Sequence, residues 1–217
     1  MQFSITTIIV IITTLVSIGG FSNRKIIEDL IFYPPAVTRQ NQWYRFFTCG
    51  LIHADWGHLF FNMLSLYLFG QYVEDAFGDL FDVYGKWVYL ALYISALLIS
   101  LLPTFAKNKN NYQYRSLGAS GAVSAVIFAG LMLTPTLGIY IFFIPIPIPG
   151  FIFAPLYLII SALLDKKGAG NINHSAHIWG SIYGLAFVII ACQFIDYPVI
   201  KNMFQEIKLY MQSKGWI

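Results

Sequence analysis

Six apolar segments constrain this chain more than any other feature of its sequence. They lie at about 3–21, 57–73, 87–103, 118–134, 151–164 and 175–195. A helix that crosses a membrane needs about 20 mostly apolar residues. In lipid a segment must satisfy its own backbone hydrogen bonds, so each of the six is expected to be a helix. Several are shorter than a full span, and we expect their ends to lie inside the membrane level, shielded by protein.

The composition agrees with a bilayer as the solvent of this protein. Of its 217 residues, 58% are hydrophobic and only 11% are charged, whereas a soluble domain carries roughly 25% charged residues. The formal net charge of +3 is spread out, without a basic cluster that would indicate nucleic acid. Cys49 and Cys192 make neither a disulfide framework nor a metal site. We predict an all-α, polytopic membrane protein with one domain over residues 1–217.

The connections help to set the boundaries of the segments. The first apolar run lacks the charged start and cleavage site of a signal peptide, so it is interpreted as a retained span. Residues 22–56 are expected to form a long interfacial loop, and 197–217 an amphipathic tail. Glu74 and Asp75 are predicted to end the second segment, and Pro103 to stop the third.

Polar side chains at one end of three segments are candidates for chemistry, because polar groups in membrane segments are costly and often functional. Ser120 begins the fourth segment, His58 begins the second and His177 begins the sixth. If successive spans alternate in direction, these three segments all enter from the same side. The side chains would then share one membrane face.

A serine beside a neutral imidazole is the combination that nucleophilic catalysis requires. Ser120 would be the nucleophile and His177 its base. His58, Asn62 and backbone N–H groups at the start of the fourth segment would stabilise an oxyanion. Because no acidic residue occurs over 83–164, we predict a dyad without an aspartate.

Small residues support this pairing of segments. Gly118 and Gly121 flank Ser120, so the backbone and a substrate carbonyl can approach closely. Gly121 also begins a face of small residues, and Gly180 and Gly184 form a similar face below His177. Such small-xxx-small faces let membrane helices pack closely.

Five motifs carry a resemblance to a known family. They are GASG at 118–121, HLFFN at 58–62, AHIWGSIYG at 176–184, YRFFT at 44–48 and IFFIPIPIPG at 141–150. The first three resemble the G-x-S-G, H-x-x-x-N and A-H-x-x-G-x-x-x-G motifs of the rhomboid intramembrane serine proteases, in the same order and on the same spans. The last two are similar to the family's Trp-Arg loop signature and to its loop between spans four and five.

The resemblance covers roughly residues 40–195 and implies a six-helix bundle that hydrolyses peptide bonds through an acyl-enzyme. It implies that Ser120 is the nucleophile, that His177 is the general base and later the acid, and that His58 and Asn62 stabilise the oxyanion. Substrates would be other membrane proteins, cut in or beside a spanning helix. Neither a metal nor another cofactor is expected, and a monomer would suffice for catalysis.

Two positions depart from the family pattern. Ser124 stands one turn after the nucleophile, where a tyrosine often packs on the catalytic histidine, so another group must orient His177. Tyr44 stands where tryptophan is usual, although Trp43 is adjacent and Arg45 is retained.

Other functions compete with proteolysis. One is a catalytically inactive rhomboid-like protein that binds membrane clients, against which the intact Ser120 and His177 argue. Another is a metal or solute transporter that uses the four histidines, which would need acidic or sulfur partners in the spans. A thiol nucleophile at Cys49 beside His53 lacks a third group. His53 is interpreted as structural support and His174 as a loop residue.

The distribution of Lys and Arg residues over the loops conflicts with the usual membrane orientation of the family. With a cytoplasmic N-terminus and a site that opens outward, the outer loops carry nine Lys and Arg residues and the inner side carries four. The positive-inside rule favours the opposite orientation. We follow the family and predict the plasma membrane of a bacterium.

Overall fold

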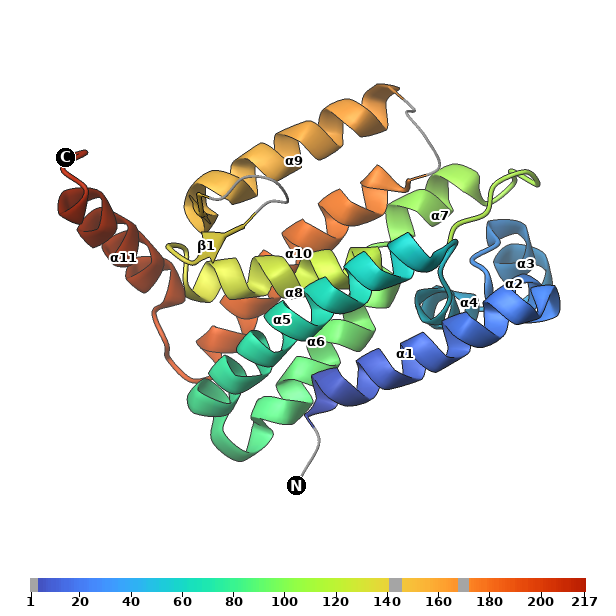
Figure 1. Cartoon of the computed structure of the whole chain (residues 1–217), viewed down its shortest axis with the longest axis horizontal. Coiled ribbons are helices and arrows are strands. Elements are labelled where there is room, and N and C mark those ends of the chain that lie inside the picture. Colours follow the sequence, from blue (N-terminus) through green and yellow to red (C-terminus); the bar gives the residue numbers. More distant parts are fainter. Residues whose placement is uncertain (1–3, 141–145, 168–171) are drawn as a thin grey trace.

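A computed structural model describes residues 4–140, 146–167 and 172–217, and almost all of their regular structure is helical (Figure 1). The elements are α1 (Ile5–Ser22), α2 (Arg24–Leu30), α3 (Pro34–Gln40), α4 (Arg45–Thr48), η1 (Cys49–Leu51), α5 (Trp56–Phe81), η2 (Asp82–Tyr84), α6 (Gly85–Ile99), α7 (Leu102–Asn108), α8 (Ser120–Leu133), β1 (Gly138–Ile139), β2 (Ile148–Pro149), α9 (Gly150–Lys167), α10 (His174–Gln193) and α11 (Val199–Ser213).

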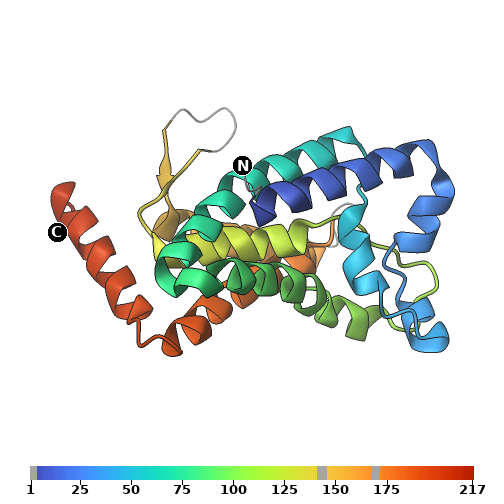
Figure 2. The same cartoon turned by 90° about the horizontal axis from the view of Figure 1, so that it is seen from below.

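Helix α8 lies at the centre of the bundle. It packs against α5, α6 and α10, while α1 lies outside against α5 and α9 lies against α10 (Figures 1 and 2). Most residues of α8 are buried, and its small side chains let three neighbours approach. Helices α5, α8 and α10 begin at one end of the bundle, and α1, α6 and α9 run the other way (Figure 1). The alternation expected from the sequence is therefore present.

The lengths of the helices support three long apolar spans in the described part of the chain. They are Ile5–Ser22, the stretch Trp56–Asn108 that contains α5 to α7, and His174–Gln193. Helix α8 is not among them, because its 14 residues make it only about 21 Å long at 1.5 Å per residue. Helix α9 is not among them either, and it ends on three charged residues. The protein is a mostly helical, multi-pass membrane protein, and six full spans remain a prediction.

The prediction that Glu74 and Asp75 end the second segment is wrong, because α5 continues to Phe81. Glu74 is buried. Its carboxylate accepts hydrogen bonds from the backbone N–H groups of Ile5 and Thr6 at 2.8 and 2.9 Å. These N–H groups begin α1, where a helix has unsatisfied donors and the positive end of its dipole. A charge inside α5 is therefore tolerated because it caps another helix.

Pro103 also acts differently from the prediction. Helix α6 ends at Ile99, and Pro103 lies in the first turn of α7. Proline fits the first turn of a helix because its missing N–H would be unsatisfied there in any case. It therefore starts a helix rather than stopping one.

The connections contain short elements rather than open loops. Residues 22–56 hold α2, α3, α4 and η1. The buried Arg45 ties this region together, since its Nη1 donates to the carbonyl oxygens of Glu28 and Ile31 at 3.0 and 2.7 Å. In the connection 134–149, β1 pairs with β2 in antiparallel register. Residues 141–145 of the corresponding motif lie outside the described residues.

Candidate active site

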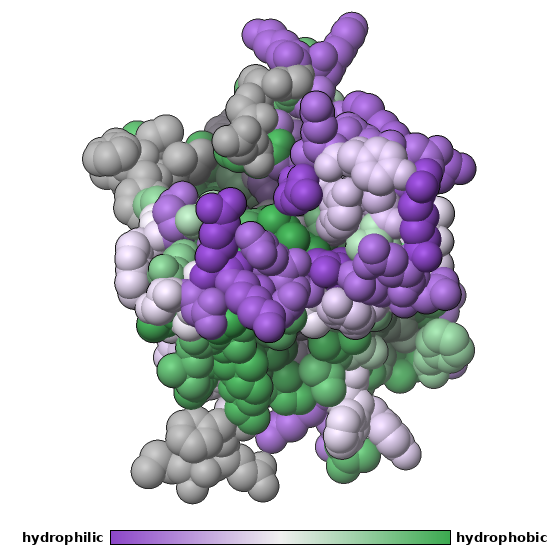
Figure 3. Space-filling model, turned by 90° about the vertical axis from the view of Figure 1, so that its right-hand side faces the viewer, coloured by the Kyte–Doolittle hydropathy of each residue, from purple (hydrophilic) through white to green (hydrophobic). Residues whose placement is uncertain are grey.

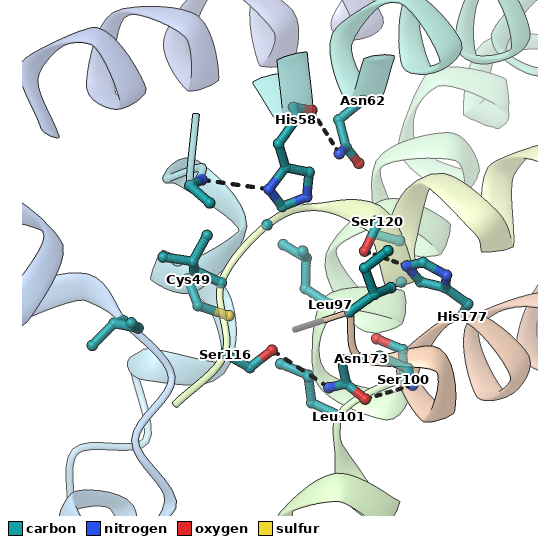
Figure 4. A pocket seen from close by; sticks show the side chains of 18 of the residues that line it. Cys49, His58, Asn62, Leu97, Ser100, Leu101, Ser116, Ser120, Asn173 and His177 are labelled. Carbon is teal, nitrogen blue, oxygen red and sulfur yellow. Dashed lines mark hydrogen bonds between the residues drawn. The ribbon is translucent and has the colours of Figure 1, made fainter. Parts of the chain in front are cut away.

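Ser120 and His177 meet at the end of the bundle where α8 and α10 begin. Ser120 is the first residue of α8, and His177 lies in the first turn of α10. The Nε2 atom of His177 is 2.7 Å from the Oγ of Ser120, and Figure 4 shows the two side chains pointing toward each other. At this distance the imidazole can accept the hydroxyl proton directly.

Close backbone packing brings the two helices to this distance. A methyl group added at Gly180 would overlap the carbonyl oxygen of Gly121, and one added at Gly184 would overlap that of Ala125. Gly121 is itself closed off on another side by the hydroxyl of Ser100. These three glycines are therefore required by space, as the small-residue faces indicated.

Gly118 gives the loop before the nucleophile its shape. Its φ is +110°, a conformation that side chains disfavour. A Cβ here would lie 2.7 Å from Cε1 of His58. Its N–H donates to the carbonyl oxygen of Cys49 at 2.9 Å, so Gly118 shapes the site but offers no free N–H to an oxyanion.

The start of α8 supplies free backbone donors beside the nucleophile. The first N–H that bonds back within this end is that of Val123, which donates to Ala119 O at 2.9 Å. The N–H groups of Ser120, Gly121 and Ala122 precede it, and no backbone partner is found for them in the described part of the chain. With the positive end of the helix dipole, they form a place for negative charge.

His58 and Asn62 lie across the pocket from this helix start, as Figure 4 shows. The Nδ1 of His58 accepts a long hydrogen bond from the N–H of Ala54 at 3.4 Å. The amide nitrogen of Asn62 donates to the carbonyl oxygen of His58 at 2.9 Å. In this arrangement the imidazole is better placed than the amide to donate to an oxyanion, because the amide is already engaged within its own helix.

A cavity of about 570 Å³ surrounds the dyad and extends toward the loops. Besides Ser120, His177, His58 and Asn62, its lining includes the apolar side chains Phe61, Leu97 and Leu101 and the polar side chains Ser100, Ser116 and Asn173. It lies at the end of the bundle that faces the viewer in Figure 3, where most of the surface is hydrophilic and hydrophobic side chains gather below. The cavity thus combines apolar and polar side chains in its lining and lies at a mainly hydrophilic end of the bundle.

Cys49 and His53 do not form a second catalytic pair. The Nδ1 of His53 is 3.0 Å from the Oγ of Ser17 on α1, and burial, with a smaller contribution from His58, lowers the pKa of His53 to about 3. Burial raises the pKa of the Cys49 thiol to about 12, so it stays protonated and unreactive. His53 therefore joins α1 to the connection before α5. This contact agrees with the interpretation of His53 as a structural residue.

The interpretation of His174 as a loop residue is wrong. It is the first residue of α10 and is buried. Its ring centroid is 5.9 Å from that of His177, at nearly a right angle. Asn173 caps the helix through its side chain, which starts α10 one residue earlier than the sequence indicated. His174 thus contacts the catalytic candidate along the same helix.

Tyr157 is a residue that the sequence did not single out. Its hydroxyl is 3.2 Å from the Oγ of Ser124, so it joins α9 to α8 one turn below Ser120. The unusual serine at 124 was the available signal, but the sequence does not indicate which helix supplies its partner. In residues 4–140, 146–167 and 172–217, no group of three or more His, Cys, Asp or Glu side chains is placed to hold a metal ion.

Most of the chain, including the catalytic candidates, is similar to a known protein domain. The rhomboid domain matches residues 40–194. This chain belongs to the rhomboid family. It is homologous to both rhomboid proteases and rhomboid-like proteins.

Rhomboid relatives occur in several lineages. Rhomboid-like protein 11, chloroplastic, from Arabidopsis thaliana is 31% identical over 163 residues, which cover 70% of this chain and 54% of that protein. Rhomboid protease GluP from Bacillus subtilis (strain 168) is 29% identical over 174 residues, 76% of this chain and 29% of GluP. The human presenilin-associated rhomboid-like protein, mitochondrial, is 27% identical over 173 residues, 75% of this chain and 42% of that protein. This rhomboid thus spans about half the length of these three relatives, or less.

Proposed function

We propose that this rhomboid is a serine endopeptidase that cuts other membrane proteins in or next to a transmembrane helix. The observation that carries the proposal is the 2.7 Å contact between His177 Nε2 and Ser120 Oγ. A hydroxyl held against a neutral imidazole, next to free N–H groups at a helix start, is an arrangement suited to acyl transfer. The name of the relative GluP as a rhomboid protease adds support.

The proposed reaction begins when His177 takes the proton of Ser120 and the oxygen attacks a peptide carbonyl. The N–H groups at the start of α8 and the imidazole of His58 stabilise the negative oxygen that forms. His177 then gives the proton to the leaving amine as the C–N bond breaks. Water, activated by the same imidazole, hydrolyses the acyl-enzyme and frees Ser120.

The substrate class follows from the surroundings of the dyad. A cavity of about 570 Å³ with a partly apolar lining accommodates a short extended segment, but a regular helix is about 10–12 Å wide with its side chains. A transmembrane substrate would therefore unwind locally before its peptide bond reaches Ser120. The expected substrates are membrane proteins whose transmembrane helix contains residues of weak helix propensity near one membrane surface.

The test uses the purified 217-residue protein in lipid vesicles with a reporter transmembrane substrate. The wild type should cleave the reporter in the presence of EDTA, and Ser120→Ala and His177→Ala should each abolish cleavage. A fluorophosphonate should form an adduct that mass spectrometry locates at Ser120. Cleavage that persists in Ser120→Ala would overturn the proposal. Loss of function with the chelator would favour a metal-handling protein, and client binding without any cleavage by the wild type would favour a silent relative.

For the location we propose the plasma membrane of a bacterium, with the dyad toward the outside. The proposal follows the usual orientation of the family, although the distribution of Lys and Arg residues favours the opposite one. A cysteine at Lys167 should then react with a membrane-impermeant maleimide added to intact cells. Reaction only after the membrane is opened would reverse the orientation.

A further inference from the structure

Helix α11 lies at the end of the bundle opposite the dyad and points away from it. The chain turns sharply after α10, with Asp196 at a φ of +53°, and α11 then runs obliquely across the ends of α8 and α10 (Figures 1 and 2). Only Val199 of this helix is buried. A 15-residue helix with so little burial needs another source of stability, because isolated helices of this length are marginal in water.

One side of α11 is fixed to the protein. The carboxylate of Glu206 accepts a hydrogen bond from the hydroxyl of Thr136, just beyond α8. The ring of Tyr210 contacts that of Phe151 at the start of α9, with 5.8 Å between their centroids. These two contacts lie one turn apart, so they fix the rotation of α11 about its axis as well as its position.

Two further strips of residues follow from that fixed rotation. An apolar strip contains Ile200, Phe204, Ile207 and Met211. These positions are separated by four, three and four residues and therefore lie on one side of a helix. Ile200 and Phe204 are 44% and 63% exposed. The protein thus leaves the side chains of Ile200 and Phe204 exposed and covers those of Ile207 and Met211 only in part.

A polar strip lies beside the apolar one, shifted by one residue. It contains Lys201, Gln205, Lys208 and Gln212, and all four are exposed. A shift of one residue is about 100° around a helix. Leu209 interrupts the polar side. Going around α11, a strip against the protein is followed by an apolar strip and then by a polar strip.

Helix α10, which comes just before α11, also exposes large apolar side chains. Near its end α10 exposes Ile190, and just beyond it Phe194 is 85% exposed. The protein is a multi-pass membrane protein, so such side chains on an outer helix face hydrocarbon. Tyr210, Lys214 and Trp216 add residue types that favour the boundary between hydrocarbon and water. A surface with this order of strips matches a bilayer interface.

We propose that α11 is an interfacial helix that docks on the lipid bilayer at the leaflet opposite the dyad. The strip of Ile200, Phe204, Ile207 and Met211 enters the acyl region, and the strip of Lys201, Gln205, Lys208 and Gln212 faces water. The occupant of the apolar strip is lipid rather than another protein. The proposal is independent of catalysis by Ser120.

Neighbouring cysteine positions give a matched test. In a background with Cys49 and Cys192 replaced by alanine, Phe204→Cys and Gln205→Cys are each spin-labelled in phosphatidylcholine and phosphatidylglycerol vesicles. The label at 204 should be relaxed more by oxygen and the label at 205 more by a water-soluble nickel complex. The pairs 200 and 201, 207 and 208, and 211 and 212 should repeat this alternation.

Two other results would overturn the proposal. Equal access of the nickel complex to both members of each pair would mean that α11 lies in water. Protection of the apolar positions from both reagents would mean that a protein covers them, and cross-linking would then identify a second copy. As an independent check, Phe204→Glu should increase nickel access at a label on residue 207, whereas Gln205→Glu should leave it unchanged. Thermal unfolding of each labelled variant verifies that the bundle is folded.

Discussion

The Nε2 atom of His177 lies 2.7 Å from the Oγ of Ser120, although 57 positions separate the two residues in the chain. Each comes from the first turn of its own helix. The contact therefore depends on how closely α8 and α10 pack, which the next prediction tests.

Gly184→Val is expected to lower cleavage at least tenfold without altering a catalytic atom. Its side chain would overlap the carbonyl oxygen of Ala125 and push α10 away from α8, and a displacement of about 1 Å can cost about a hundredfold in rate. Fluorophosphonate labelling of Ser120 and cleavage of a reporter substrate measure the effect. Gly78→Val is the matched control, because nothing lies within 4 Å of a Cβ there. Equal activity of the two variants would contradict the packing argument.

His58→Ala is expected to reduce kcat by about a hundredfold and to change KM little. A donor that acts on the developing oxyanion is worth about 10²–10³ in turnover. Asn62→Ala should cost less, because its amide already donates to the carbonyl oxygen of His58. Steady-state kinetics of the two variants separate their roles. A larger loss for Asn62→Ala would show that the amide rearranges toward the substrate.

Glu74→Gln is expected to lower the free energy of unfolding by about 1–3 kcal/mol, the usual cost of leaving buried polar groups unpaired. The carboxylate accepts from the N–H groups of Ile5 and Thr6, and an amide offers them only one acceptor oxygen. Thermal unfolding in detergent is the measurement. The exposed neighbour gives the control Asp75→Asn, and equal effects of the two changes would mean that the cap contributes nothing.

His53 is expected to make the protein less stable as pH falls. Burial lowers its pKa to about 3 from an ordinary value of 6.5, so the unfolded chain binds a proton that the folded protein does not. The stability from the neutral imidazole is complete above pH 6.5 and is lost progressively between 6.5 and 3, by up to about 1.4 kcal/mol per pH unit. Unfolding of His53→Gln over this range should show a shallower slope. A constant offset with an unchanged slope would contradict the assignment.

Much of this protein could be predicted from its sequence because lipid allows few structures. Apolar segments in a membrane must be helices, and their alternation brought Ser120, His58 and His177 to one end of the bundle. The rhomboid family also followed from the order of the motifs and is confirmed. The catalytic roles of these residues stay predictions until activity is measured.

The errors share one physical cause, which is that a residue's neighbours in space decide its role. Glu74 reads as a helix end in the sequence, but the start of α1 supplies its partners and α5 continues. Gly118 was expected to let a substrate carbonyl approach the backbone, yet its own N–H already donates to the carbonyl oxygen of Cys49. Tyr157 reaches Ser124 from another helix. None of these contacts leaves a periodic or local signal.

The glycine contacts between α8 and α10 have a consequence for the order of events in any turnover. Backbone touches backbone at Gly180 and again at Gly184, so this pair of helices is a rigid unit that cannot separate without dismantling the dyad. If the bundle opens to admit a substrate segment, the helices around this pair must move. The dyad would thus be assembled before a substrate binds. Conformational adaptation to different substrates would take place in the outer helices of the bundle.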